Sequence, residues 1–337
     1  MTGNSERRDV VVVGASAGGV EALKALACGL PPDLPAAIFV VLHLPRNGPS
    51  ALAPILARSG PLTATTAADG VVPRLGQIYV APPDHHLVFH DRRIWLSRGP
   101  AENGHRPAVD TMFRSAARAH RRRVIGVVLS GSRDDGAAGL LTISRAGGAA
   151  LVQDPLDALY PSMPRAALAS VPGASTAPAN AIGSMLGDLC RRAPDPSSAD
   201  GSPGDGDLAE LTPATADLTA PSAGFGCPSC GGSLFELATL PVPRFRCRVG
   251  HAWSAGTLLE EQSGAMESAL WTALRALQEK AELTRRLAAA GGSRGTSRSA
   301  SRYDALAEES RRAGVLIRGL IDSIGAAGLH ETPASID

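Results

Sequence analysis

The sequence lacks a net charge of either sign, because 33 Lys and Arg residues balance 32 Asp and Glu residues to a formal charge of +1. A global attraction to nucleic acid, to a membrane surface or to a polyanionic substrate is therefore not expected. No segment approaches the roughly 18 uninterrupted apolar residues of a membrane span, so membrane insertion is not expected either. Residues 1–16 show neither an apolar run of signal-peptide length nor a cleavage-site pattern, and we expect a cytoplasmic protein.

Cysteine is also scarce. The chain has five cysteines, an odd number, and three of them cluster in the segments CPSC and FRC. In a cytoplasmic chain such a cluster indicates metal ligation rather than a disulfide framework. Cys28 and Cys190 stand alone, and we expect both to be buried structural thiols.

What the sequence does contain, from residue 9 to about residue 190, is an alternation of short apolar runs with helical patterns. Apolar runs without in/out alternation predict strands buried on both faces, as in a parallel sheet covered by helices. We therefore predict an α/β fold with a doubly wound parallel sheet in three layers and an active site at the carboxyl ends of the strands. The expected strands are DVVVVG, AAIFVVLH, QIYVAP, VIGVVLSG and GAALVQD, and the expected helices span residues 19–30, 50–59, 109–120 and 137–146.

The composition predicts four parts along the 337 residues. The α/β domain is expected over 1–192, and a Pro-, Ser-, Gly- and Asp-rich stretch over 193–223 reads as a flexible linker. A small Cys/His module is expected over 224–256. Two long apolar patterns over 257–327 predict a helical hairpin or short coiled coil. The repeating apolar positions are Met266, Leu270, Leu274, Leu277 and Ala281 in the first helix, and Leu306, Ala313, Ile317, Leu320 and Ile324 in the second.

The turn GASAGG after the first expected strand has a serine where dinucleotide binding needs a glycine. The fingerprint G-x-G-x-x-G requires bare backbone at its second glycine, and Ser16 occupies that position between Gly14 and Gly19. The second strand ends at His43, whereas a dinucleotide site has an acidic residue there to bind the ribose. This also argues against dinucleotide binding. The same turn suits a nucleophile, because it lifts Ser16 above the sheet edge beside the N–H groups that begin a helix.

A serine nucleophile needs a base and a group that orients the base. His43 ends the neighbouring expected strand, so it should reach the same rim as Ser16, although a lone strand-end histidine is usually a hydrogen-bonded structural residue. Asp134 and Asp135 follow another buried strand. One of them can hold the imidazole while the other simply favours a helix N-terminus. Spacing alone does not choose between the two carboxylates.

Six blocks follow one another along the chain, from VVVGASAGGVEAL to SMPRAAL. In this order they resemble the catalytic domain of the CheB family of chemotaxis protein-glutamate methylesterases over roughly residues 9–190. The resemblance implies hydrolysis of glutamate methyl esters on chemoreceptor helices with release of methanol, a related deamidation of receptor glutamines, and no cofactor for catalysis. It implies that Ser16 is the nucleophile, His43 the general base and Asp135 the orienting carboxylate. The blocks are VVVGASAGGVEAL, VVLHLP, GQIYVAPPDHHL, NGHRPAVDTMF, VVLSGSRDDGAAGL and SMPRAAL.

The chain departs from the family pattern in three ways. Where the family commonly reads T-G-M-G-x-D-G, this chain has SGSRDDG, which places Ser132 and Arg133 where Met and Gly are usual. Ala17 stands where Thr is frequent, so only a backbone N–H can act there. We also expect the receiver domain that usually precedes the catalytic domain to be absent, because the first strand begins about nine residues from the start.

Arg106 and Arg165 are candidates to line the rim and contact an acidic receptor helix, although exposed arginines are more often simply solvated.

The segments CPSCGG and RFRCRVGH predict a metal site. Cys227 and Cys230 form a C-x-x-C pair, and Cys247 and His251 form a C-x-x-x-H pair further along. Zinc favours such thiolate and imidazole sets, and a closed set of four ligands is structural rather than catalytic. The residues between the two pairs are typical of a small hairpin, as in a zinc ribbon. We therefore expect a structural zinc in this module, without which so short a segment would hardly fold.

Two other interpretations stay open. One is a non-catalytic signalling adaptor that binds partners through its zinc and helical modules, which the altered turn at Ser132 and Arg133 favours and the presence of all three triad residues opposes. The other is an esterase that acts on a different carboxyl ester. We expect methyl-accepting chemoreceptor helices as partners, no nucleic acid, and the C-terminal helices as a candidate surface for a homodimer or a protein partner.

Overall fold

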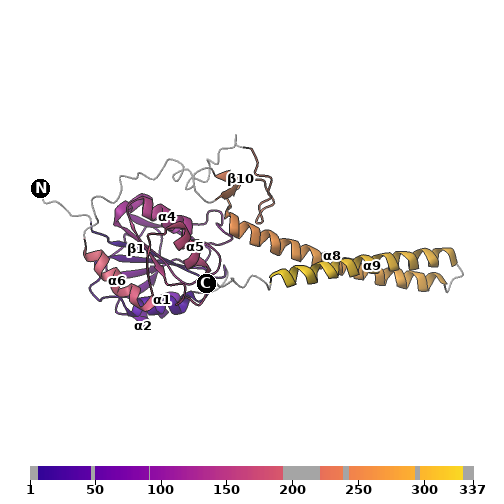
Figure 1. Ribbon diagram of the computed structural model, residues 1–337, viewed down its shortest axis with the longest axis horizontal. Helices are drawn as coiled ribbons and strands as arrows, with labels where there is room; N and C mark the ends of the chain where they lie inside the picture. The colour runs from indigo at the N-terminus through magenta and orange to yellow at the C-terminus, as the bar shows by residue number, and fades with distance from the viewer. Residues whose placement is uncertain are drawn as a thin grey trace, which may run out of the picture. The chain divides into compact units, whose positions relative to one another are not determined.

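The computed structural model describes residues 7–46, 50–90, 92–192, 221–237, 243–292 and 297–328 (Figure 1). The chain divides into two compact units, 1–258 and 259–337. The Cys/His module therefore belongs to the same unit as the α/β fold. Most of the linker expected at 193–223 lies outside the described residues.

A seven-stranded parallel sheet forms the centre of the first unit, with the strand order β3-β4-β2-β1-β7-β8-β9. In the middle of the sheet Val13 of β1 lies between Val40 of β2 and Val127 of β7. Every residue of these three strands is buried, as the unbroken apolar runs predicted. The strands are β1 (Val10–Ala15), β2 (Ala37–Leu42), β3 (Thr63–Thr66), β4 (Gln77–Val80), β7 (Val124–Val128), β8 (Ala149–Gln153) and β9 (Ser175–Ala177).

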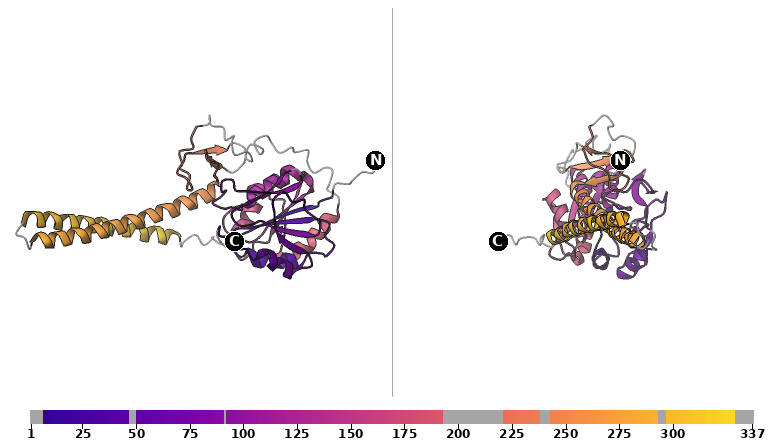
Figure 2. Two further views of the ribbon diagram at one scale, coloured as in Figure 1. Left: turned by 180° about the vertical axis from the view of Figure 1, so that it is seen from behind. Right: turned by 90° about the vertical axis from the view of Figure 1, so that its right-hand side faces the viewer.

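Helices cover both faces of the sheet, so the predicted doubly wound, three-layer fold is confirmed (Figures 1 and 2). Alternate residues of β1 face opposite layers: Val11 and Val13 join one core cluster, and Val10 and Val12 join the other. One layer contains α1 (Gly19–Cys28), α2 (Leu52–Ser59) and α6 (Ala179–Arg191), and the other contains α3 (Val109–His120), α4 (Ala137–Arg145) and α5 (Ser162–Ser170).

Several elements were not expected from the sequence. The edge strand β3 is a run of partly exposed threonines and an alanine, so it carries no buried apolar signal. The antiparallel hairpin of β5 (His86–His90) and β6 (Arg93–Ser97), the edge strand β9, the helices α5 and α6 and the short 3₁₀ turn η1 (Arg121–Arg123) were also missed. In α6, Gly183 and Gly187 interrupt the apolar pattern because the helix packs closely on residues 26–31.

The expectation for the two lone thiols is half right. Cys190 is buried near the end of α6 as predicted, but Cys28 is exposed. The prediction was wrong for Cys28 because α1 turns Ala22, Leu23 and Leu26 into the core and leaves its last residue on the solvent side.

The Cys/His module contains a three-stranded antiparallel sheet of β10 (Leu234–Leu237), β11 (Arg244–Cys247) and β12 (Ala252–Ser254). The hairpin expected between the two ligand pairs corresponds to β10 and β11, and β12 was not expected. Leu234, Phe245 and Trp253 form its small core with Cys227 and Cys247.

Two long helices complete the chain: α8 (Ala255–Gly292), which begins in the first unit, and α9 (Ser297–Gly328). In the second unit they pack against each other, with Gly314 opposite Leu274 and the Arg318 guanidinium 4.9 Å from the centre of the Trp271 ring. The predicted pattern is wrong at Met266 and Leu320, which are exposed. In α9 the buried positions are Ser310, Gly314 and Ile321. After Ile317 the next position on the packed face is four residues further along, at Ile321, rather than three.

None of the helices in the described ranges is both long enough and apolar enough to cross a bilayer.

Candidate active site

Ser16 lies in the turn between β1 and α1, above the carboxyl end of the central strand. Its N–H donates to the carbonyl of Ser130 at 2.9 Å, and its carbonyl accepts the N–H of Gly19 at 2.9 Å. The turn requires glycine at position 18, where φ is +68° and a Cβ would lie 2.8 Å from the Ser130 hydroxyl. These contacts hold Ser16 partly exposed at the rim.

His43 reaches Ser16 because the two residues follow neighbouring strands. Ala15 and Leu42, the last residues of β1 and β2, are paired in register, and the N–H of His43 donates to the carbonyl of Ala15. The ring Nδ1 of His43 lies 3.0 Å from the Ser16 hydroxyl. When the proton of the neutral ring is on Nε2, Nδ1 is free to accept the hydroxyl proton of Ser16.

Asp135 lies on the other side of the same imidazole, with Oδ2 2.8 Å from Nε2 of His43. Its carboxylate also accepts the N–H of Val109 at 2.7 Å and of Asp110 at 3.0 Å, the first two residues of α3. Burial raises the pKa of Asp135, but the hydrogen bond and the charge of His43 outweigh it and hold the pKa below its usual value. An ionised Asp135 keeps the Nε2 proton in place, so the serine faces the unprotonated nitrogen.

The choice between the two neighbouring acids, which spacing left open, follows from these directions. Asp134 points away from the imidazole and accepts the hydroxyl protons of Ser254 and Thr257 at 2.9 and 2.7 Å. Ser16, His43 and Asp135 therefore form one continuous chain of hydrogen bonds, and Asp134 contacts the Cys/His module instead.

His105 is a neighbour of this chain that sequence reasoning missed. Its ring stacks on that of His43, with the ring centres 3.7 Å apart and the planes 8° from parallel. Burial, followed by the charge of His43, lowers the pKa of His105 to about 4. His105 is therefore neutral near pH 7 and packs against the base without adding a second charge. It stands in the block NGHRPAVD, which was noted only for its arginine.

The turn after β7 carries the departures from the family pattern. Arg133 has φ +67°, a left-handed conformation that favours the glycine usual at this place. The N–H of Gly131 donates to the carbonyl of Tyr160 at 2.9 Å, so this N–H is occupied, like that of Ser16. Ala17, which follows Ser16 in the turn before α1, offers a further backbone N–H.

The two arginines predicted to line the rim differ in their surroundings. Arg106 donates from Nε and Nη2 to Asp84 at 2.9 and 2.6 Å and from Nη1 to the carbonyls of Arg98 and Gly99. Its guanidinium is thus committed to internal acceptors. Arg165 is exposed on α5, where a ligand could reach it.

The four predicted metal ligands come together in the Cys/His module. The ligand atoms of Cys227, Cys230, Cys247 and His251 all lie within 4.8 Å of one another. The Sγ atoms of Cys230 and Cys247 are 3.6 Å apart, and Nδ1 of His251 is 3.6 Å from Sγ of Cys247. Three thiols and an imidazole at these separations fit a tetrahedral metal site.

Comparisons with known proteins agree with this geometry. A family model described as CheB methylesterase matches residues 11–186. A protein-glutamate methylesterase/protein-glutamine glutaminase of Anaeromyxobacter dehalogenans is 43% identical over 162 residues, which is 48% of this chain and 48% of that protein. A relative of the same name from Yersinia pestis is 38% identical over 164 residues, covering 48% of this chain and 47% of that protein. The chain therefore spans about half the length of the curated relatives it matches.

A solved structure is similar as well. The crystal structure of the Thermotoga maritima CheB methylesterase catalytic domain superimposes with a TM-score of 0.52 and 31% sequence identity. The match covers 54% of this chain and 98% of that one. The family match ends at residue 186, before the Cys/His module begins.

Proposed function

This chain belongs to the CheB methylesterase family, and on that premise we propose that it hydrolyses glutamate methyl esters on methyl-accepting chemoreceptor proteins and releases methanol. Deamidation of receptor glutamines is proposed as the related reaction of the same site, because the matched relatives carry both names. The observation that carries the proposal is the hydrogen-bonded chain from Ser16 through His43 to Asp135.

In the proposed reaction the Ser16 oxygen attacks the ester carbonyl carbon while Nδ1 of His43 takes the hydroxyl proton. The tetrahedral intermediate collapses, the C–O bond to the methoxy group breaks, and His43 returns the proton to the leaving methanol. A water molecule then attacks the acyl-serine with the same proton transfer, which releases glutamate and restores Ser16. Asp135 stays ionised throughout and stabilises the imidazolium that forms in each step.

The negative oxygen of the intermediate is proposed to bind at the N-terminus of α1. The backbone N–H of Ala17 is the donor adjacent to Ser16, and the helix dipole favours negative charge at this place. This assignment removes the altered residues Ser132 and Arg133 from the oxyanion contacts, so the departure at that turn does not prevent catalysis.

The Cys/His module is proposed to hold a structural zinc through Cys227, Cys230, Cys247 and His251. Three thiolates and an imidazole complete a tetrahedral set, and such a closed site supplies folding energy rather than a reactive water. The residues between the ligands supply only a small apolar core around Phe245 and Trp253, which suits a module that depends on metal.

The proposed substrate surface surrounds Ser16. In the loop between β8 and α5, Leu156 is 92% exposed and Leu159 is 72% exposed. A Cβ at Gly18 would lie 3.0 Å from that of Leu159, so the loop borders the nucleophile's turn. These apolar side chains, with Arg165 on α5, suit the mixed apolar and acidic face of a receptor helix. A cytoplasmic location and a homodimer through the C-terminal helices remain predictions.

The decisive test is methanol release from a methylated receptor by the full-length protein and by Ser16→Ala. We expect steady release by the wild type and none above background by the variant. Ser184→Ala is the matched control, because Ser184 is exposed on α6 and its hydroxyl donates to the carbonyl of Ala181 in the same helix. Its activity should equal that of the wild type.

Other outcomes separate the alternatives. Activity absent from both proteins would support the non-catalytic adaptor, whose partners would then be sought on the zinc and helical modules. Activity confined to small esters would keep the chemistry but exclude the receptor as substrate.

A further inference from the structure

The Cys/His module touches the α/β fold beside the triad through main-chain hydrogen bonds. The N–H of Asn103 donates to the carbonyl of Ala252 at 2.8 Å, and the N–H of Ala252 donates to the carbonyl of Ala101 at 3.4 Å. Ala252 of β12 therefore forms a parallel bridge with Glu102, in the segment that precedes α3. All of these residues belong to the first compact unit.

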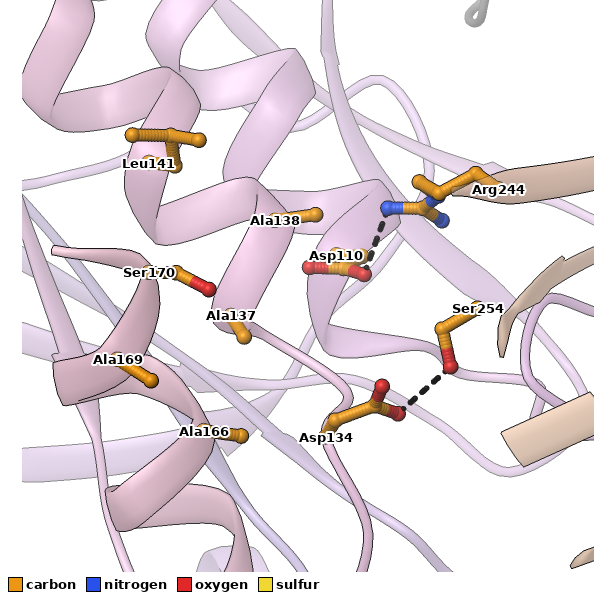
Figure 3. A pocket seen from close by; sticks show the side chains of 10 residues that line it. All are labelled: Asp110, Asp134, Ala137, Ala138, Leu141, Ala166, Ala169, Ser170, Arg244 and Ser254. Carbon is orange, nitrogen blue, oxygen red and sulfur yellow. Dashed lines mark hydrogen bonds and ion pairs between the residues drawn. The ribbon is translucent and has the colours of Figure 1, made fainter. Parts of the chain in front are cut away.

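An arginine of the module lies among acids of the α/β fold. Arg244 of β11 is 2% exposed and forms ion pairs with Glu102 and Asp110, the second at 3.0 Å (Figure 3). Glu102 also pairs with Arg114. Burial raises the pKa of Glu102, but the charges of Arg114 and Arg244 outweigh it and hold the pKa well below its usual value. The carboxylate is thus charged, and the module supplies part of the compensating charge.

Asp110 transmits this contact to the turn that carries Asp135. Its Oδ1 accepts the N–H of Gly136 at 3.0 Å and of Gly139 at 2.6 Å, which caps the start of α4. Its own backbone N–H donates to Asp135. Arg244 binds the other oxygen of the Asp110 carboxylate, Oδ2. The rotation of the Asp110 carboxyl group therefore links Arg244 to the position of Asp135.

A second connection between the module and Asp135 runs through Asn103, which is 1% exposed. Its side-chain oxygen accepts the N–H of Ser254 at 2.9 Å, and its amide nitrogen lies 3.4 Å from Oδ1 of Asp135. A third route holds the adjacent residue, because the Ser254 and Thr257 hydroxyls donate to Asp134. The module thus contacts Asn103, whose amide lies beside the Asp135 carboxylate, and Asp134, the residue before Asp135.

These polar contacts border an open space. A cavity of about 200 Å³ lies between the module and the helices α4 and α5, floored by small side chains such as Ala137, Ala138 and Ala166 (Figure 3). Figure 3 shows the Arg244–Asp110 and Ser254–Asp134 contacts bordering this space. Around this cavity the module contacts the α/β fold through charge-assisted hydrogen bonds, which are geometrically specific.

We propose that the Cys/His module is a working part of the active site, and that Arg244 is a positioning residue that holds the Asp135 turn in place through Asp110. The proposal rests on the proposed esterase function for its readout. Arg244 touches neither substrate nor the reacting atoms. Its guanidinium binds Asp110 with one terminal nitrogen and Glu102 with the other, a fixed geometry that a single ammonium group does not reproduce.

The test uses the full-length protein with Arg244→Met, Arg244→Lys and the control Arg248→Met. Arg248 belongs to the same module but is exposed, with its guanidinium 5.5 Å from the centre of the Phe235 ring. Two rates are measured per mole of folded enzyme: methanol release, and labelling of Ser16 by a fluorophosphonate, which needs no receptor. Circular dichroism and thermal unfolding define the folded fraction.

We expect Arg244→Met to lower kcat roughly 10- to 100-fold with KM within about twofold of the wild type, because a small displacement of catalytic groups costs rate rather than binding. Ser16 labelling should slow by a similar factor. Arg244→Lys should recover part of the loss, and Arg248→Met should match the wild type. A folded Arg244→Met with wild-type kcat and labelling would overturn the proposal, as would a change in KM alone.

Failure of the proposed function would look different. A wild type that releases no methanol but labels at Ser16, with slower labelling in Arg244→Met, would refute the receptor esterase and leave the positioning role standing. Should Arg244→Met not fold, the double variant Ser254→Ala/Thr257→Val keeps the buried cation and removes the contacts to Asp134, together with the bond from the N–H of Thr257 to the Ser254 hydroxyl. It should lower kcat roughly three- to tenfold at constant KM, and an unchanged kcat would overturn the proposal.

Discussion

The two ends of the seven-stranded sheet use polar side chains in opposite ways. At the carboxyl end, Ser16, His43 and Asp135 form a relay that ends in a partly exposed hydroxyl. At the amino end, Asp9 precedes β1 and Arg123 precedes β7, and they pair through two hydrogen bonds of 2.9 and 2.6 Å. That pair uses both carboxylate oxygens within the protein. The hydrogen-bonded chain at the carboxyl end thus leaves a hydroxyl partly exposed, whereas the Asp9–Arg123 pair occupies its carboxylate.

The imidazoles of the two ends differ in the opposite sense. His43 has a partner on each ring nitrogen. His120, at the end of α3 and just before β7, packs edge-on against Phe89, and neither of its ring nitrogens finds a hydrogen-bond partner among the described residues. Substitutions at the carboxyl end should therefore change activity more than stability, and those at the amino end should do the reverse.

The largest expected effect is that of Asp135→Asn. The asparagine amide cannot hold the Nε2 proton in place as the carboxylate does, so kcat should fall by about 10⁴-fold. Asp9→Asn at the opposite end is the matched control and should keep full activity. Steady-state methanol release from a methylated receptor measures both. A modest loss in Asp135→Asn would show that His43 does not depend on this carboxylate.

Metal removal should have the next largest effect on rate. Removing the proposed zinc from the chain should loosen the Cys/His module and, through Arg244, lower kcat roughly 10- to 100-fold, the range found when groups that orient a metal site are lost. Adding zinc back should restore it. Atomic absorption and methanol release are measured on the same samples.

The control for metal removal is Cys28→Ser, which changes an exposed thiol outside the ligand set. It should keep both the metal and the activity. Protein purified from zinc-supplemented cells without bound metal would contradict this prediction, and so would full activity after chelation.

The amino end should respond to acid. Burial, and then the charge of Arg123, lowers the pKa of His120 to about 4, against 6.5 for an unfolded chain. The unfolded state binds more protons between these values, so the stability contributed by neutral His120 is present above pH 6.5 and is lost as the pH falls to about 4. The loss from this one side chain is about 3 kcal/mol.

Urea unfolding at pH 7 and pH 4.5 tests this pH dependence. His120→Leu has no proton to bind, so its free energy of unfolding should fall less than that of the wild type over the same interval. Its methanol release at pH 7 should be unchanged, since His120 does not take part in the triad. An equal decline in both proteins would show that other groups account for the acid sensitivity.

The smallest expected effect concerns the ion pair of Asp9 and Arg123. Both side chains are partly exposed, so the pair should stabilise the fold by about 0.5 to 1 kcal/mol. A double-mutant cycle with Asp9→Asn and Arg123→Met, followed by urea unfolding, measures that coupling. A change in kcat in any of these variants would break the distinction between the two ends.

The sequence allowed prediction of the parts whose signal is local. Unbroken apolar runs revealed the central strands, and Ser16 and His43 were found because each directly follows such a run. The choice of Asp135 over Asp134 was not local, because it depends on backbone donors of α3 that lie 25 and 26 residues earlier. The edge strand β3 escaped notice because partly exposed strands need no apolar run.

The contacts of the module were beyond prediction from the sequence. Arg244 and Glu102 are 142 residues apart, and neither lies in a periodic pattern that points to the other. Arg106 shows a different limit of the sequence. Its place in a characteristic block suggested a ligand contact, whereas the fold ties its guanidinium to Asp84. Spacing predicts which residues share a rim, but not which of them are already engaged there.

The burial of Arg244 between two carboxylates limits how freely this architecture can be recombined. A Cys/His module taken from another chain would need a cation at the position of Arg244. Without one, Glu102 and Asp110 would both have to be replaced by neutral residues. Substitutions at these three positions should therefore be inherited together, and descendants that shed the module should have replaced the acids as well.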